Sequence, residues 1–389
     1  MIYNADLHVH IGSTIDGSPI KITASKQLTI LNILEESLKK GLDIVGIIDS
    51  ASPKVINEIN FHIDNGTLVP IKGGGLKYKN KLTLILGSEI EIGKDEKGSP
   101  HLLAYFKTIE DINQFSIIIK KSIKNINLSS QRCRLNSIEV LKIVSMLGGF
   151  VIPAHIFTPF KSYYGSSSNR LINIFKDSYE KFWGVELGLS SDTNMADTIA
   201  ELKEKTFLSN SDAHSIAKIA REFNAFEIED SNFDEILLAI KRLNGRKIIK
   251  NYGLNPMLGK YHRTFCTECG LILQGVTEIE KCPQCGSKKI IIGVKDRIDK
   301  IKDYDTIHPT FRPPYIYQIP LEYIPGIGKK TIQKLLNEVG SEIYVMHQAD
   351  FNELKSAVGE KIARNIIDVR EGKFIISSGG GGIYGKIKQ

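Results

Sequence analysis

The chain has 389 residues, of which 42% are hydrophobic, and a net charge of +7. This length provides for a sizeable core and for two or three domains. The N-terminal residues lack the basic and apolar stretches of a secretory signal, and no apolar run approaches the ~20 residues that a membrane span needs. We therefore expect a soluble protein of the cytoplasm rather than a secreted or membrane protein.

The basic residues concentrate in the last third of the chain. Residues 246–389 contain 23 Lys and Arg against 15 Asp and Glu, whereas residues 1–245 contain 28 against 29. A basic C-terminal region is typical of a protein that contacts an acidic partner such as nucleic acid. A solvated lysine-rich surface explains the charge equally well.

Residues 1 to about 250 alternate strand-like and helical segments. The expected strands lie at 42–48, 82–86, 149–153, 183–187 and 206–208, and the expected helices at 30–40, 137–147 and 195–203. This alternation predicts an α/β domain with a largely parallel sheet.

Histidines and carboxylates recur mostly where these strands end. His8 and His10 are one residue apart, so their side chains point to the same side of an extended strand. Functional groups gather at the carboxyl ends of strands in parallel sheets and barrels. His101 differs because it begins an apolar run. The candidate metal ligands are His8, His10, Asp49, Glu89, His101, His155, Asp212 and His214.

A site of imidazoles and carboxylates without thiolates suits Zn, Mn or Fe, including clusters of two or three ions. Closely spaced ions activate a water and clamp both oxygens of an in-line phosphoryl displacement. A bridging carboxylate is needed to hold two cations together, and Glu89 or Asp212 fits that role. Taken singly, each residue is more simply an ordinary polar side chain, but the whole set favours a metal centre. The candidate catalytic residues are Asp212, His214 and Glu89.

Four of the five cysteines form two C-x-x-C pairs, each followed by a glycine. Four thiolates close a tetrahedral shell and leave no open position, which predicts a structural zinc rather than a redox site. The predicted ligands are Cys266, Cys269, Cys282 and Cys285.

A proline-rich segment at 308–320 predicts an extended spacer. Residues 324–331 then read Ile-Pro-Gly-Ile-Gly-Lys-Lys-Thr and precede a helical segment. A glycine hairpin that opens a helix exposes backbone N–H groups at the positive end of the helix dipole, which favours phosphate binding. Residues 357–362 look like a degenerate second copy of this hairpin. The candidate DNA contacts here are Gly326, Gly328, Lys329 and Lys330.

The C-terminal tail is rich in glycine. A flexible end is its simplest interpretation. The alternative is a loop whose backbone approaches a ligand closely, with Tyr384 stacking on a base.

The first 250 residues resemble a PHP (polymerase and histidinol phosphatase) domain. The PHP motifs H-x-H, G-x-E, isolated histidines and D-x-H match His8/His10, Glu89, His101, His155 and Asp212/His214. PHP domains commonly carry Asp-His at the second motif, whereas this chain has Asp49-Ser50. Either Asp49 substitutes as a ligand there or that metal position is altered.

The order of PHP domain, four-cysteine ribbon, helix-hairpin-helix element and glycine tail resembles the endonuclease Q family of DNA-repair nucleases over nearly the whole chain. Residues 153–159, 210–215, 259–262 and 312–315 also fit that family closely. The resemblance implies a PHP-type distorted (β/α) barrel at 1–250, a zinc-binding domain at 251–305 and a helix-hairpin-helix DNA-binding region with its tail at 306–389.

The resemblance also implies an activity and its partners. The family cleaves the phosphodiester bond 5′ of uracil, hypoxanthine, xanthine or an abasic site in DNA. We expect Zn²⁺ on the cysteines and in the PHP site, Mg²⁺ or Mn²⁺ for activity, and a nucleoid-associated monomer. Relatives bind a sliding clamp, which makes a clamp a candidate partner, although the sequence shows no clear clamp-binding peptide. Lys161, Arg221 and Glu186 lie near the motifs and are candidates for contacts to phosphate or to the ligands.

Two other functions fit parts of the sequence. A PHP phosphoesterase of small phosphate monoesters needs only the first 250 residues, and the hairpin and the localised charge argue against it. A non-catalytic DNA-binding module would not need the nearly complete ligand set.

Overall fold

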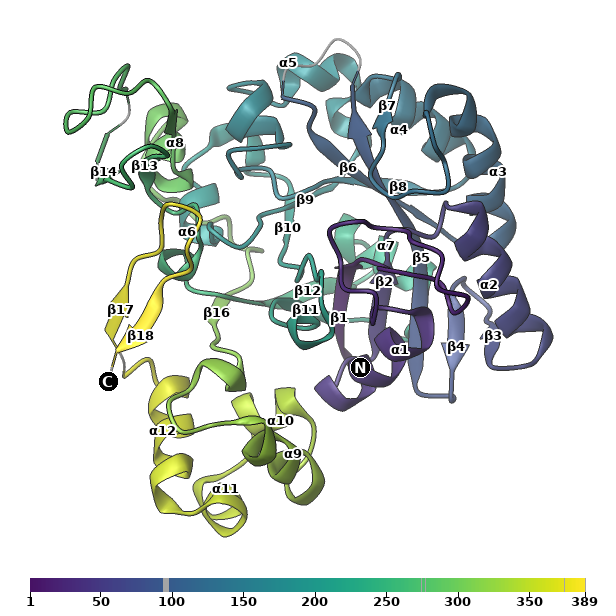
Figure 1. Ribbon diagram of the computed structural model, residues 1–389. Helices are drawn as coiled ribbons and strands as arrows, with labels where there is room; N and C mark the ends of the chain where they lie inside the picture. Colours follow the sequence, from purple (N-terminus) through teal and green to yellow (C-terminus); the bar gives the residue numbers. More distant parts are fainter. Residues whose placement is uncertain (94–97, 274, 277, 374, 389) are drawn as a thin grey trace.

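The computed structural model describes residues 1–93, 98–273, 275–276, 278–373 and 375–388. Its centre is an 11-stranded mixed sheet (Figure 1). In this sheet β1 lies between β11 and β2, β2 also pairs with β5, and β6 pairs with both β5 and β8. The strands of this sheet are β1 (Ile2–Val9), β2 (Ile44–Ile47), β3 (Leu68–Pro70), β4 (Leu76–Tyr78), β5 (Leu82–Ile92), β6 (His101–Phe106), β7 (Arg132–Cys133), β8 (Phe150–Pro153), β11 (Phe223–Glu227), β12 (Lys247–Gly253) and β16 (Tyr315–Tyr317).

A second, two-stranded parallel sheet of β9 (Gly184–Glu186) and β10 (Thr206–Leu208) completes the ring of strands. Side chains join β10 to β11 and β12: the Asn251 amide donates to the Phe207 carbonyl at 2.9 Å, and the Ser209 N–H donates to Asn224 Oδ1 at 2.9 Å. The strands therefore form a distorted barrel rather than an open sheet.

The expectation of a largely parallel sheet is wrong. The β1–β2 and β2–β5 pairs are parallel, but β1–β11, β11–β12, β5–β6 and β6–β8 are antiparallel. β5 and β6 are joined by a short connection, which permits antiparallel pairing but is too short for a parallel crossover.

Helices pack against this barrel through apolar faces. In α1 (Ile30–Lys40), the Thr29 side chain accepts from the Asn32 N–H at the start, and Gly41 ends the helix at φ +92°. Ile30, Ile33 and Leu34 face the core, the spacing of an amphipathic helix. The other helices of this region are α2 (Pro53–Asp64), α3 (Ile109–Ile119), α4 (Ser137–Met146), α5 (Ile172–Phe175), α6 (Thr193–Ala196) and α7 (Phe233–Lys241).

The helix expected at 195–203 is shorter than predicted. α6 ends at Ala196, and a 3-10 turn follows at Ala200–Leu202. Tertiary contacts account for the break, because the Ala200 N–H donates to Asp303 Oδ2 at 2.8 Å and Asp197 pairs with Arg312.

Two smaller units follow the barrel (Figure 1). The first contains β13 (Thr264–Cys266), β14 (Ile272–Leu273), β15 (Ile290–Ile291) and α8 (Val294–Ile301). The second contains α9 (Lys329–Glu338), α10 (Glu342–His347), α11 (Phe351–Val358) and α12 (Glu360–Arg370), followed by the hairpin of β17 (Ile375–Ser377) and β18 (Lys386–Lys388).

Both units are packed onto the barrel. Val294, Ile298 and Ile301 of α8 belong to the same buried core cluster as the barrel. Lys40 of α1 forms a buried ion pair with Glu342 of α10. The four C-terminal helices also have a core of their own around Leu335.

The proline-rich segment is more ordered than a spacer. Its β16 pairs in parallel with β12, and β12 itself crosses the boundary expected at residue 250. The Arg312 guanidinium donates two hydrogen bonds to the Asp197 carboxylate, from Nη2 at 2.7 Å and from Nε at 3.0 Å, and both side chains are buried. Within the described residues, no helix is long and apolar enough to cross a membrane.

Candidate functional site

One group of candidate ligands surrounds Asp212, in the loop after β10. His8 Nε2 and His10 Nε2, at the end of β1, each lie 3.4 Å from Asp212 Oδ1, and His214 Nε2 lies 3.3 Å from the same oxygen. Asp212 has φ +46°, a backbone conformation uncommon outside glycine, and this turn directs its carboxylate back toward β1.

A second group surrounds Glu89. Its Oε1 lies 2.6 Å from His101 Nδ1, on the neighbouring strand, and 3.5 Å from His155 Nε2, after β8. Glu89 also contacts the first group. Its Oε1 lies 3.6 Å from His8 Nε2, and its Oε2 lies 3.6 Å from His10 Nε2. Glu89 is inside β5 rather than after it, since that strand continues to Ile92.

Three imidazole nitrogens of these groups make no hydrogen bond and fit a divalent cation. His8 Nε2, His10 Nε2 and His101 Nε2 are buried and have no hydrogen-bond partner. A buried polar nitrogen without a partner is costly, and a metal ion would satisfy it. His8, His10 and Asp212 place ligand atoms within 4.8 Å of one another, and so do Glu89, His101 and His155. We therefore propose two adjacent metal positions that share Glu89.

Hydrogen bonds behind the ligands fix their orientation. Glu186 Oε2 lies 2.9 Å from His8 Nδ1, and its Oε1 accepts from the His155 N–H at 3.1 Å. Thr158 Oγ1 lies 3.1 Å from His155 Nδ1. Such partners select the tautomer that presents Nε2 to a metal. We therefore propose that Glu186 orients His8 and His155 rather than contacting phosphate.

Asp49 also lies behind a ligand. Its Oδ2 accepts from the Ile11 N–H at 2.6 Å and lies 3.1 Å from His10 Nδ1, while Oδ1 accepts from Ser129. Asp49 is not part of either ligand group. We propose that it orients His10 instead of substituting for the missing histidine of the second motif.

The carboxylates are held ionised. Burial raises the pKa of Glu89, but His101 and Lys21 oppose this and hold it well below its usual value. Burial likewise raises the pKa of Asp212, but His8 and His10 bring it well below its usual value. Ionised carboxylates are the form that coordinates divalent cations.

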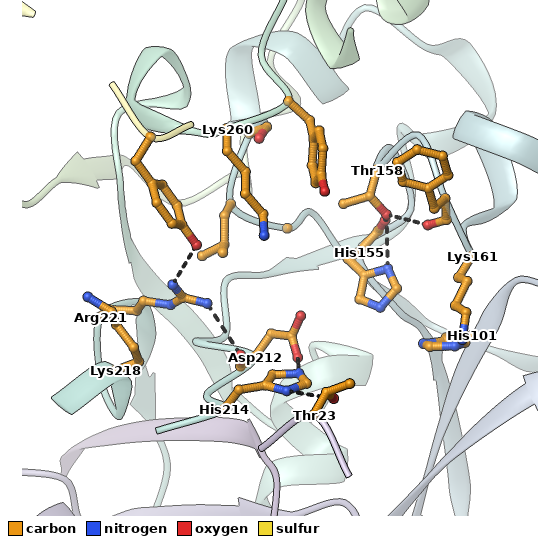
Figure 2. A pocket seen from close by; sticks show the side chains of 16 residues that line it. Thr23, His101, His155, Thr158, Lys161, Asp212, His214, Lys218, Arg221 and Lys260 are labelled. Carbon is orange, nitrogen blue, oxygen red and sulfur yellow. Dashed lines mark hydrogen bonds and ion pairs between the residues drawn. The ribbon is translucent and has the colours of Figure 1, made fainter. Parts of the chain in front are cut away.

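A cavity of about 520 Å³ opens directly above these ligands. Figure 2 shows Lys260 reaching in from the side opposite Asp212 and His214, with His155 and His101 on a third side. Aromatic side chains also line the cavity: Phe160, Tyr261 and Tyr384. Its walls therefore combine metal-ligand candidates from the barrel with cationic and aromatic groups from the C-terminal third.

The glycine tail forms part of this wall, so the interpretation as a flexible end does not hold for its described residues. The N–H groups of Gly379 and Gly385 donate to the carbonyls of Met257 and Leu258 at 2.7 and 2.9 Å. A Cβ at Gly385 would lie only 2.7 Å from the Met257 carbonyl oxygen, so this close approach needs glycine. Tyr384 is thereby held at the cavity.

The four cysteines come together as expected. Cys266 Sγ lies 3.6 Å from Cys285 Sγ, and Cys269 Sγ lies 3.5 Å from Cys282 Sγ. A glycine at positive φ follows each cysteine pair: Gly270 has φ +72° and Gly286 has φ +70°. The N–H of each glycine donates to the carbonyl of the first cysteine of its pair, Cys266 or Cys282. Four sulfurs at this spacing suit a tetrahedral zinc ion.

The glycine hairpin precedes α9. Gly326 has φ +85°, and Lys329 and Lys330 are exposed on the first turn of the helix. An added Cβ at Gly326 or Gly328 would meet nothing within 4 Å, so the backbone is open to a large ligand. Asn365 Nδ2 donates to the Pro325 carbonyl at 3.0 Å and joins this hairpin to α12, which follows the second hairpin glycine, Gly359.

Several residues at the site were not predicted from the sequence. Lys21 contacts Glu89, Thr23 contacts His214, and Phe160 lines the cavity. They lie in irregular loops, where no periodicity or motif distinguishes them. Of the two basic residues near the motifs, Lys161 pairs with Glu91 at 2.6 Å, and Arg221 donates from Nε to the Ser211 carbonyl at 2.8 Å.

Comparisons with known proteins agree with this architecture. A family model described as PHP-associated matches residues 191–244. The protein YqxK of Bacillus subtilis (strain 168) is 44% identical over 387 residues, which cover 99% of this chain and 98% of YqxK.

Two solved structures match the whole chain. The crystal structure of the lesion-specific endonuclease PfuEndoQ from Pyrococcus furiosus has a TM-score of 0.86 and 34% identity, covering 100% of this chain and 95% of that chain. A crystal structure of endonuclease Q with a 27-mer duplex substrate carrying an abasic lesion at the active site has a TM-score of 0.87 and 35% identity, covering 100% and 96%. The expected PHP-type fold with a four-cysteine unit and a helical C-terminal unit is confirmed, and the chain belongs to the endonuclease Q family.

Proposed function

We propose that the chain is a metal-dependent DNA endonuclease that hydrolyses the phosphodiester bond 5′ of a damaged deoxynucleotide. The proposed lesions are uracil, hypoxanthine, xanthine and the abasic site. The observation that carries the proposal is the position of the cavity, which lies between the two ligand groups and the aromatic and basic side chains of the C-terminal third. A small-molecule phosphatase needs no such wall from a distant domain.

Divalent ions held by these ligands would supply an activated water and would neutralise charge on the phosphodiester. His8, His10 and Asp212 are the proposed ligands of one ion, and Glu89, His101 and His155 those of the other, with Glu89 between them. His214 lies beside Asp212 and is partly exposed to the cavity, so it is placed to touch the scissile phosphate.

A damaged nucleotide is proposed to enter the cavity by leaving the base stack. Damaged bases pair poorly, so extruding them costs less than extruding a normal base, and this difference contributes selectivity. The aromatic rings of Tyr261 and Tyr384 offer stacking surfaces, and the Lys260 ammonium lies 5.3 and 5.7 Å from their ring centroids. Lys218 and Arg221 add positive charge to the cavity wall.

The rest of the duplex is proposed to contact the basic C-terminal region. The hairpin before α9 presents backbone N–H groups with Lys329 and Lys330, a surface suited to phosphate. Contacts of this kind are independent of sequence and position the duplex. A cytoplasmic location at the nucleoid and a monomeric state belong to the same proposal.

The test uses an end-labelled duplex with one lesion and either Mn²⁺ or Mg²⁺. The proposal predicts a single nick 5′ of the lesion and no cut in the undamaged duplex. Asp212→Asn should lose the activity, whereas Asp177→Asn, at an exposed position, should keep it. Failure to nick any lesion, together with turnover of a small phosphate monoester, would instead support a PHP phosphoesterase.

A further inference from the structure

A lysine side chain reaches the metal centre from the loop between β1 and α1. Lys21 Nζ donates to Glu89 Oε2 at 2.9 Å and to Ser130 Oγ at 2.5 Å, and its side chain is only 12% exposed. The Lys21 N–H donates to the Ile11 carbonyl at 3.0 Å, which ties this loop to the segment that follows His10. These hydrogen bonds of the Lys21 side chain and backbone fix the position of the ammonium beside Glu89.

The same side of the centre lacks a histidine. Ser50, where PHP domains commonly have one, is fully buried and donates its hydroxyl back to the Ile47 carbonyl at 2.8 Å. Asp49 is already engaged by His10, Ile11 and Ser129. No imidazole nitrogen among the described residues therefore faces this side from the second motif.

The carboxylates on this side nevertheless need a cation. Glu89 and Asp49 are both buried, and a buried carboxylate without a nearby positive charge is costly. An ionised carboxylate oxygen accepts more than one partner, so Glu89 Oε2 can contact both Lys21 and an ion bound near His10. The Lys21 ammonium supplies this positive charge on the side of Glu89 that faces neither ligand group.

We propose that the Lys21 ammonium is a built-in cation that replaces a third divalent ion, so that the centre holds two ions instead of three. The inference rests on the proposed metal centre of the nuclease. It follows from two ligand groups, a hydrogen-bonded lysine on the remaining side of Glu89, and a serine turned away from that side. An ammonium and a divalent ion do not share this position, because like charges at such a short separation repel each other.

The experiment counts metal ions in the full-length protein. The protein is stripped with a chelator, reconstituted with Mn²⁺ and freed of excess metal, and Mn and Zn per chain are then measured separately by mass spectrometry. Thiolates favour zinc, so Mn reports the PHP centre. The wild type should hold two Mn per chain, and a count of three would overturn the proposal.

Variants identify the role of the charge. Lys21→Met removes the ammonium at similar length and should raise the count from two to three, while Lys21→Arg keeps the charge and should stay at two. Lys26→Met, an exposed lysine of the same loop, is the matched control and should also stay at two. A folded Lys21→Met protein that still holds two Mn would refute the replacement.

The outcome is separate from catalysis. A wild-type protein that holds two Mn but does not cut lesion DNA would contradict the proposed function and leave this inference standing. If Lys21→Met does not fold, as judged by circular dichroism, the wild-type count decides alone.

Discussion

Arg221 Nη1 donates a hydrogen bond to the Tyr384 hydroxyl at 3.2 Å, across 163 positions of the chain. The same guanidinium donates to the carbonyls of Ser211 and Asp212 at 2.8 and 3.3 Å. One side chain therefore connects the C-terminal tail to the loop that carries a central ligand candidate. The wall of the cavity and its metal centre are thus fixed relative to each other.

We predict that Tyr384→Ala lowers kcat/KM on uracil-containing duplex by about 5- to 150-fold, because stacking a base on an aromatic ring is worth about 1–3 kcal/mol. The loss should be smaller on an abasic duplex, which has no base to stack. Nicking kinetics on the two substrates measure the difference. Tyr384→Phe should keep most activity, and Ile383→Ala, whose side chain is exposed, is the control. Equal losses on both substrates would argue against stacking.

The paired change Lys329→Ala and Lys330→Ala should weaken binding to damaged and undamaged duplex alike. Each phosphate contact contributes about 0.9 to the slope of log affinity against log salt, so the slope should fall by about two. Fluorescence anisotropy at several salt concentrations tests this. Lys334→Ala, on the same helix and beside Glu338, should leave the slope nearly unchanged. A loss confined to damaged DNA would place these lysines in lesion recognition instead.

Removal of the zinc that we propose for the four cysteines should disable the cavity without emptying the PHP centre. Cys282→Ser should release one zinc per chain, unfold the ribbon and displace Tyr261, which packs near Phe265 of β13. Metal analysis and lesion cleavage measure the two effects. Cys133→Ser alters a buried thiol outside the four-cysteine group and should retain the zinc. Full activity of zinc-free protein would contradict this role.

Glu222 should make the stability of the fold depend on pH. Burial raises its pKa from 4.5 to about 8, so between these values the folded chain keeps a proton that the unfolded chain has lost. The free energy of unfolding therefore falls as pH rises through this window. Glu222→Gln cannot ionise and should melt a few degrees above the wild type at pH 9, with a smaller difference at pH 5.

Thermal melts at the two pH values test this prediction. Glu227→Gln, at an exposed position of β11, is the control and should not reproduce the pH dependence. A difference between Glu222→Gln and wild type that is the same at both pH values would show that Glu222 does not titrate in this range.

The sequence predicted the parts of the site that follow from local rules. His8 and His10 are predictable from strand alternation, and the cysteine pairs from their spacing. Lys21 was not predictable, because its contact with Glu89 joins residues 68 positions apart and depends on a loop without periodicity. The tail was also ambiguous, because its glycines permit flexibility and close packing equally, and only the hydrogen bonds to Met257 and Leu258 decide between them.

The most direct test of the whole account is anomalous scattering from crystals of the stripped protein soaked in Mn²⁺. The account predicts two adjacent peaks at the floor of the cavity, one among His8, His10 and Asp212 and one among Glu89, His101 and His155. Apart from a metal peak at the four cysteines, peaks at other positions instead of these two, or no peaks at these residues at saturating Mn²⁺, would contradict it.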